Sequence, residues 1–310
     1  MSLFNSLWND LKYGFKMGNM VRKLILINVL VFVLVQIVNL GCNIYGAGRD
    51  VSSLLLWDIL HYFCFPSDWR ELLWHIWTPI TSIFLHQGLW HLIGNMIWLS
   101  MFGTIVGDLI GDRRVLPIYL LGGLAGGFMY FITANLLPSI GEHALGASAA
   151  VMAFGGTALM LNPEYRVGLL FLGEVKIKYI VLIMVLLDLV GVSGIYNSGG
   201  HAAHLGGFIF GVAYVYALRD RNDWTEPVNR ILDKMDDFIS GLFTRRKPRM
   251  RVTHNRREQT QQQTRAQGSG KTDVSHQERL DQILDKIKQK GFEQLTQEEK
   301  DFLYEASRRK

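Results

Sequence analysis

Residues 22–218 consist largely of apolar runs that approach 20 residues, and this feature most limits how the chain can fold. A helix of about 20 apolar residues spans the hydrocarbon core of a bilayer, where only helices or closed barrels satisfy their own backbone groups. Residues 219–310, by contrast, are charged and polar. We therefore expect an all-α polytopic membrane bundle followed by a soluble tail.

Six transmembrane helices are predicted. Their approximate ranges are 24–41, 83–106, 115–137, 146–161, 177–192 and 201–218. The first run lacks a small-residue cleavage site, so it is predicted to be a retained span. The connection 42–76 contains apolar pieces that are too short and too often charged to span, and it is rich in Trp and Tyr. These pieces are predicted to be interfacial segments.

The basic residues of the loops predict the orientation. With a cytoplasmic N-terminus, the inner loops and the start of the tail contain most of them: Arg113, Arg114, Arg166, Lys176, Lys178, Arg219 and Arg221. The outer loops then contain only Arg49 and Arg70. This distribution agrees with the positive-inside rule, so both termini are predicted to be cytoplasmic. We expect a multi-pass integral membrane protein.

Four segments are expected along the chain. They are an N-terminal cytoplasmic amphipathic segment (1–21), a six-span membrane domain (22–219), a basic polar linker (220–275) and a small cytoplasmic helical hairpin (276–310). Within the hairpin, Thr296 and Glu299 have the spacing of a capping box, which predicts a helix start. The hairpin is too short for a large core of its own, so we interpret it as a docking or regulatory module.

The net charge and the cysteine content of the chain indicate which binding partners to expect. The net charge of +5 comes mostly from the tail and the short loops, so it indicates membrane orientation and not nucleic-acid binding. The lipid bilayer is therefore the expected surroundings of the chain. Cys42 and Cys64 do not form a disulfide framework, and whether they pair stays open. No metal site and no cofactor are expected.

Three spans carry polar residues near their first turns, and by alternation these are the spans that enter the membrane from the outer side. The residues are His86, His91 and Asn95 in the second span, Ser148 in the fourth, and His201 and His204 in the sixth. A single buried histidine is usually structural. Polar groups at membrane depth are costly, however, and three helices that place them at one level predict a shared wet cavity.

Ser148 stands at the start of the shortest span. The run from Gly146 to Leu161 has 16 residues, or about 24 Å of helix, which is less than the roughly 30 Å hydrocarbon core. Its N-terminus is therefore predicted to lie below the outer surface, with Ser148 among free N–H groups that favour negative charge. Most serines at a helix start are caps or packing residues. Ser148 is a candidate nucleophile only in combination with the histidines of the other spans.

The other polar residues fit an acyl-transfer site. Gly207 and Gly211 of the sixth span permit the close helix approach that a Ser–His hydrogen bond requires, which makes His204 the candidate general base. His91 and Asn95 are four residues apart on one helix face and are candidate donors to an oxyanion. Standing alone, that pair would be read as a polar contact between helices.

At these residues the chain resembles the rhomboid intramembrane serine proteases, in a bacterial type with a C-terminal cytoplasmic helical extension. The resemblance implies a multi-pass protein of a bacterial inner membrane. The resemblance covers about residues 75–219 and rests on three motifs in order, FLHQGLWHLIGN (84–95), GASAA (146–150) and AHLGG (203–207). By position, it implies a catalytic Ser148–His204 dyad without an aspartate and an oxyanion site at His91 and Asn95. It gives His86 a more structural role, and it implies single-pass membrane proteins as substrates.

The sequence departs from the family pattern at four places without losing a reacting group. These are Ala149 in place of glycine, Trp77–Thr78 in place of a Trp–Arg pair, Gly107 at an acidic position, and Met152 at an aromatic one. Asp188 lies near the outer end of the fifth span and is a candidate partner that orients His204, but a local cap or a polar contact is favoured. Whether Asp188 or His201 assists is left open.

Three functions compete at this stage. The first is an intramembrane serine endopeptidase that cuts substrates within or near their transmembrane segment. The second is a rhomboid-like pseudoprotease that binds membrane proteins for quality control or trafficking, although such relatives usually lack the Ser or the His. The third is a channel or transporter, which the absence of an inverted repeat disfavours. The particular substrate and the oligomeric state are not predicted.

Overall fold

The computed structural model describes residues 19–45, 51–137, 140–169, 173–194, 197–243, 271–290 and 292–308. The chain divides into two compact units, Met1–Lys247 and Pro248–Lys310. Most of the predicted amphipathic segment 1–21, and residues 244–270 of the predicted linker, lie outside the described residues. Those two predictions therefore stay predictions.

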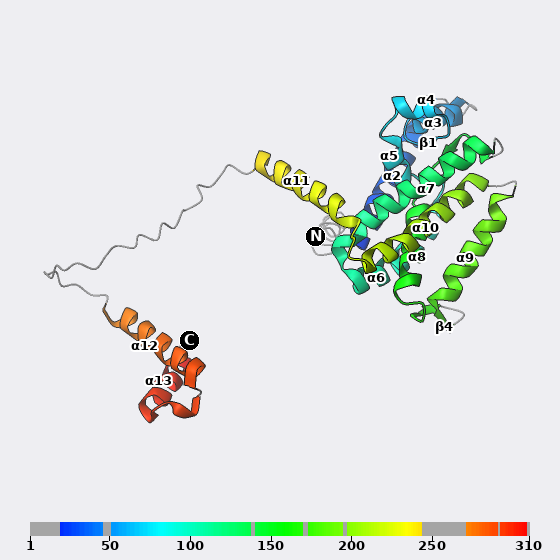
Figure 1. The fold of residues 1–310 in the computed structure, drawn as a ribbon. Helices are drawn as coiled ribbons and strands as arrows, with labels where there is room; N and C mark the ends of the chain where they lie inside the picture. The colour runs from blue at the N-terminus through cyan, green and yellow to red at the C-terminus, as the bar shows by residue number, and fades with distance from the viewer. Residues whose placement is uncertain are drawn as a thin grey trace. The chain divides into compact units, whose positions relative to one another are not determined.

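Helices occupy all six predicted span positions in the first unit (Figure 1). They are α2 (Met20–Tyr45), α6 (Leu89–Ile110), α7 (Val115–Leu136), α8 (Ser148–Leu161), α9 (Ile177–Val192) and α10 (Ser198–Arg219). Among the described residues, four helices are long and apolar enough to cross a membrane, and these correspond to α2, α6, α7 and α10. Helix α8 has only 14 residues, in line with its short apolar run. The predicted all-α membrane bundle is confirmed.

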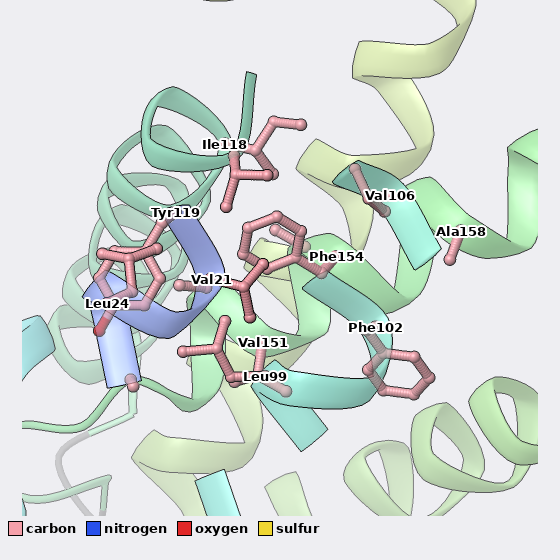
Figure 2. Close-up of a cluster of buried hydrophobic side chains, with 14 of the residues drawn as sticks. Val21, Leu24, Leu99, Phe102, Val106, Ile118, Tyr119, Val151, Phe154 and Ala158 are labelled. Atoms are coloured by element: carbon pink, nitrogen blue, oxygen red, sulfur yellow. The ribbon is translucent and has the colours of Figure 1, made fainter. Parts of the chain in front are cut away.

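The core lies where α2, α6, α7 and α8 meet (Figure 2). Figure 2 labels its members Val21, Leu24, Leu99, Phe102, Val106, Ile118, Tyr119, Val151, Phe154 and Ala158, all of which are buried. One polar contact is embedded beside it, because the buried Asn28 donates from Nδ2 to the Tyr119 hydroxyl at 3.0 Å. That hydroxyl in turn donates to the Ile83 carbonyl at 2.9 Å, so the side chains of Asn28 and Tyr119 are both hydrogen-bonded.

Small residues let α7 pack closely on α8. A Cβ placed on Gly122 would lie 2.3 Å from Cβ of Ala153, and one on Gly126 would lie 2.3 Å from Cβ of Ala149. Contacts that short do not occur, so only glycine fits at both positions. Helices in a bilayer associate through such close packing of small residues, which explains the glycine-rich third span.

Short elements fill the connection between α2 and α6. They are α3 (Val51–His61), β1 (Phe65–Pro66), α4 (Trp69–Trp74), α5 (Thr78–Thr81) and the 3-10 turn η1 (Ser82–Phe84). Strand β1 pairs antiparallel with β2 (His143–Ala144), with Pro66 opposite His143. The connection is thereby tied to the segment that precedes α8. Cys42 and Cys64 are both buried and free, which answers the question of their pairing.

Three elements after α8 were not anticipated. Strands β3 (Arg166–Leu169) and β4 (Gly173–Lys176) form an antiparallel hairpin that leads into α9, and α11 (Thr225–Phe243) follows α10. Helix α11 lies inside the range 220–275 that was predicted to be a polar linker. Its apolar residues do recur at helical spacing, at Val228, Ile231, Met235, Phe238 and Leu242. The high charge of the segment obscured this pattern.

The start of α11 is fixed to the turn η2 (Asp112–Arg114), which precedes α7. Arg114 Nε donates to Asp223 Oδ2 at 2.8 Å. The Thr225 hydroxyl and the Thr225 backbone N–H both donate to the other oxygen of Asp223, at 2.6 and 3.0 Å. Asp223 therefore caps α11 and links it to the membrane bundle.

The second unit is a helix pair, α12 (Lys271–Lys290) and α13 (Gln297–Arg308), with the 3-10 turn η4 (Phe292–Gln294) between them. The predicted capping box is present, since the Thr296 N–H donates to Glu299 Oε2 at 2.8 Å and the Glu299 N–H donates to the Thr296 hydroxyl at 3.4 Å. Lys286 Nζ also donates to Glu299, at 2.7 Å, and ties the two helices together.

Candidate active site

Ser148 is the first residue of α8, and the backbone before it is held in an unusual conformation. Gly146 has φ of +127°, which residues with a side chain rarely adopt, and its N–H donates to the Ser82 carbonyl at 2.9 Å. The first hydrogen bond of the helix runs from the Val151 N–H to the Ala147 carbonyl. The N–H groups of residues 148–150 thus lack helical partners and form a favourable place for negative charge.

One cavity of about 400 Å³ is lined by all four residues that the sequence singled out. They are Ser148 from α8, His204 from α10, and His91 and Asn95 from α6. Asp188, His201 and Met152 line it as well. Three helices therefore bring the candidate nucleophile, base and oxyanion donors to one hollow, although they are far apart in the chain.

The room between His91 and Ser148 depends on Gly146. A Cβ placed on Gly146 would lie 3.1 Å from Nε2 of His91 and 3.7 Å from Oγ of Ser148. The imidazole and the hydroxyl therefore border the same small space, which a side chain at residue 146 would narrow. The buried ring of His86 packs edge-on to that of His91 with centroids 5.1 Å apart, which suits a supporting position behind the cavity.

Asn95 keeps one donor for a ligand. Its Nδ2 donates to the His91 carbonyl at 2.9 Å, which is the i to i−4 bond of a polar side chain on a helix. A carboxamide has two N–H bonds, so the second is available to the cavity. The same bond fixes the orientation of the Asn95 amide relative to His91.

The approach of α10 to α8 is close at the level of the histidine. A Cβ placed on Gly207 would lie 2.0 Å from the Ala149 carbonyl oxygen, and one on Gly211 would lie 2.1 Å from that of Ala153. The two glycines thus have the packing role that the sequence predicted. Gly207 is one helical turn after His204, and Ala149 adjoins Ser148, so this contact sets the spacing of the candidate dyad.

Asp188 of α9 contacts both histidines of α10. Its Oδ1 lies 2.8 Å from Nδ1 of His204 and 2.8 Å from Nδ1 of His201. The side chain of Asp188 is only 7% exposed. Sequence reasoning favoured a local cap or a polar contact at this residue, and the structure gives it polar contacts with His201 and with the candidate base. The sequence did contain a signal for this contact, since Asp188 is the one acidic residue in the apolar range 177–192. A carboxylate buried in such a helix needs a polar partner.

The fold and the cavity define a class of protein, an integral membrane protein whose helix bundle encloses a pocket lined by serine and histidine. The family model of the rhomboid domain matches residues 73–221, which include α6 to α10. Over these residues the chain therefore matches the rhomboid family. A second match, over residues 272–309, is to DUF6576, a family of unknown function, and it covers the helix pair α12–α13.

Curated relatives are rhomboid-like as well. The chain is 30% identical over 138 residues to the presenilin-associated rhomboid-like protein A, mitochondrial, of Danio rerio, which covers 44% of this chain and 36% of that protein. It is 27% identical over 215 residues to the human presenilin-associated rhomboid-like protein, mitochondrial, covering 68% and 50%. It is 30% identical over 183 residues to the mitochondrial rhomboid protein 1 of Saccharomyces cerevisiae, covering 54% and 50%.

These matches span half or less of each relative's own length. All three relatives are named as mitochondrial, so they give no support to the predicted bacterial membrane. They agree with the motifs in placing the chain among rhomboid-like membrane proteins.

Proposed function

We propose that the chain is an intramembrane serine endopeptidase that cleaves single-pass membrane proteins within or near their transmembrane segment. One observation carries the proposal: a hydroxyl, an imidazole and two further polar donors from three helices line a single cavity. The apolar helices around the cavity suit a substrate that arrives through the bilayer. The match to the rhomboid family supports the same reaction class.

In the proposed reaction, Oγ of Ser148 attacks the carbonyl carbon of the substrate while His204 takes the hydroxyl proton. The tetrahedral oxyanion receives hydrogen bonds from His91, from the free N–H of Asn95 and from the N–H groups at the start of α8. His204 then gives its proton to the leaving amine as the C–N bond breaks. Water attacks the acyl-enzyme in the same manner, and the Ser148 hydroxyl is restored.

Asp188 is proposed as a positioning residue for His204. A carboxylate oxygen only accepts hydrogen bonds, so its contact with Nδ1 of His204 places the ring proton there. Nε2 is then left free to accept the proton of Ser148, which is the tautomer that general-base catalysis needs. His201 shares the same oxygen and fixes the carboxylate from the other side.

The test is cleavage of a single-pass reporter by the purified chain in liposomes. Ser148→Ala and His204→Ala are each expected to reduce the rate by at least about 10³-fold, because each removes a reacting group. Ser100→Ala is the matched control, since Ser100 is a serine of helix α6 that does not line this cavity. It should cleave at the wild-type rate.

A fluorophosphonate probe gives an independent reading. It should label the wild type and the Ser100→Ala variant at Ser148, and it should leave Ser148→Ala unlabelled. A wild type that neither cleaves the reporter nor reacts with the probe would contradict the protease. Binding of the reporter without cleavage would then support the pseudoprotease.

A further inference from the structure

A second polar cluster lies outside the candidate active site, in the segment between α2 and α6. Three imidazoles surround one carboxylate oxygen, Oε1 of Glu71. Nε2 of His61 lies 2.6 Å from it, Nε2 of His143 lies 3.5 Å from it, and Nδ1 of His75 lies 4.0 Å from it. The four residues come from the end of α3, from α4, from the residue after α4 and from β2.

The cluster leaves buried polar atoms without partners. Nδ1 of His75 and Nε2 of His143 are buried and make no hydrogen bond within the described part of the chain. Oε1 of Glu71 is buried too, and its neighbours are the imidazole nitrogens of the cluster itself. The side chain of His143 is only 9% exposed. Buried polar atoms nearly always have a partner, and an ion bound between these side chains would satisfy all of them together.

The donor set and its spacing fit a transition-metal ion. The ligand atoms of His61, Glu71 and His143 all lie within 4.8 Å of one another. Ligands at 2.0–2.1 Å from Zn²⁺ in a tetrahedron are roughly 3.3 Å apart, which is near the middle of the distances found here. Imidazole nitrogen suits Zn²⁺, whereas Ca²⁺ and Mg²⁺ require mainly oxygen ligands.

We propose that His61, Glu71 and His143 bind Zn²⁺, with His75 as the fourth ligand. His75 follows Glu71 by four residues, so a small rotation of its ring brings Nδ1 into the same sphere. This inference departs from the sequence analysis, which expected no metal. The four proposed ligands are spread over 83 residue positions, from 61 to 143, so no single short motif in the sequence predicts the set.

Such a site would fasten the outer connection to the candidate active site. His143 is opposite Pro66 in the β1–β2 pair, and the chain runs from β2 through Gly146 directly to Ser148. His143 also lines a cavity of about 450 Å³ that Ser148 lines. A metal that joins α3, α4 and β2 would therefore hold the wall of this cavity in place.

The experiment uses the full chain in lipid nanodiscs, stripped with a chelator and then titrated with Co²⁺ and Zn²⁺. The wild type should bind one Co²⁺ with the visible absorption of a tetrahedral site, and Zn²⁺ should displace it. Glu71→Gln and His143→Asn should each weaken binding by more than about ten-fold, because even loss of a residue that only supports a ligand costs about that much. Zn²⁺ should raise the thermal midpoint of the wild type but not those of Glu71→Gln and His143→Asn.

Asp188→Asn is the control, because Asp188, His201 and His204 form the second group, among the described residues, whose ligand atoms lie close enough together to hold a metal. It should bind Co²⁺ as the wild type does. Metal-free thermal midpoints report folding of the variants, and X-ray absorption of the Zn²⁺-loaded wild type reports the ligands directly. A wild type without metal binding, unchanged binding in both ligand variants, or loss of binding in Asp188→Asn alone would each overturn the proposal.

Discussion

The contact between α10 and α8 at Gly207 offers the sharpest test of the proposed dyad. A Cβ at this position would lie 2.0 Å from the Ala149 carbonyl oxygen and 2.8 Å from its carbon. Both partners are backbone, so no side chain is able to swing aside. The helices must separate by about 1 Å or more to accept alanine, because the interior is close-packed. Ser148 and His204 lie on the two sides of that contact.

Gly207→Ala should therefore affect geometry and stability together. A displacement of about 1 Å between reacting groups costs roughly 100-fold in rate, or about 2.7 kcal/mol of transition-state stabilisation. Overpacking adds a loss of about 1–3 kcal/mol of folding free energy. We expect kcat/KM for the reporter to fall about 100-fold and the thermal midpoint to drop, as measured on the same liposome preparation.

Gly41→Ala is the matched control, since Gly41 is also helical and a Cβ there would meet nothing within 4 Å. It should keep the wild-type rate and midpoint. Gly211→Ala, one turn farther from His204, should lower stability similarly but cost less activity. Wild-type activity and stability in Gly207→Ala would refute the argument that this contact sets the Ser148–His204 spacing.

Two further predictions concern carboxylates. Asp188→Asn should lower kcat about 100-fold with little change in KM, because the amide no longer enforces the reactive tautomer of His204. His201→Asn should keep kcat within about three-fold of the wild type. Equal losses of kcat in the two variants would count against a positioning role for Asp188. Burial tends to raise the pKa of Asp223, but hydrogen bonds from Thr225 and Arg114 outweigh it and hold that pKa below the usual 3.8. A lowered folded-state pKa means that the stabilisation is present above pH 3.8 and is lost as the pH falls through the folded value. Asp223→Asn preserves the cap, and it should lower the free energy of unfolding by about 1 kcal/mol at pH 7. Its thermal midpoint should converge with that of the wild type in acid. A difference between the two thermal midpoints that persists at low pH would contradict this account.

The helices of the bundle were predictable because each depends on the apolarity and length of a single continuous segment. The run 177–192 became α9 with the same bounds, since an apolar run in a bilayer must satisfy its backbone by forming a helix. The capping box at Thr296 was likewise readable, because a cap depends on residues within one turn. The amphipathic α11 was missed, since its alternating charges resemble those of a solvated linker.

The candidate site was predictable in part. The motifs around His91, Ser148 and His204 place polar groups at the start of three spans, and all three residues line one cavity. The contact of Asp188 with both histidines was not predictable from spacing, since it joins two helices whose mutual rotation no local pattern sets. The cluster at Glu71 was missed for the same reason.

The sequence by itself determined the membrane bundle, its six helices and the polar residues that enter them, because length, apolarity and small-residue spacing act locally along the chain. Only the tertiary structure decided which side chains meet. The carboxylate of Asp188 reaches His204, and His61 reaches His143 across 81 intervening positions, because packing of separate helices and one short strand pair bring them together. Such contacts depend on rotation and depth of whole elements, and these follow from the packed core.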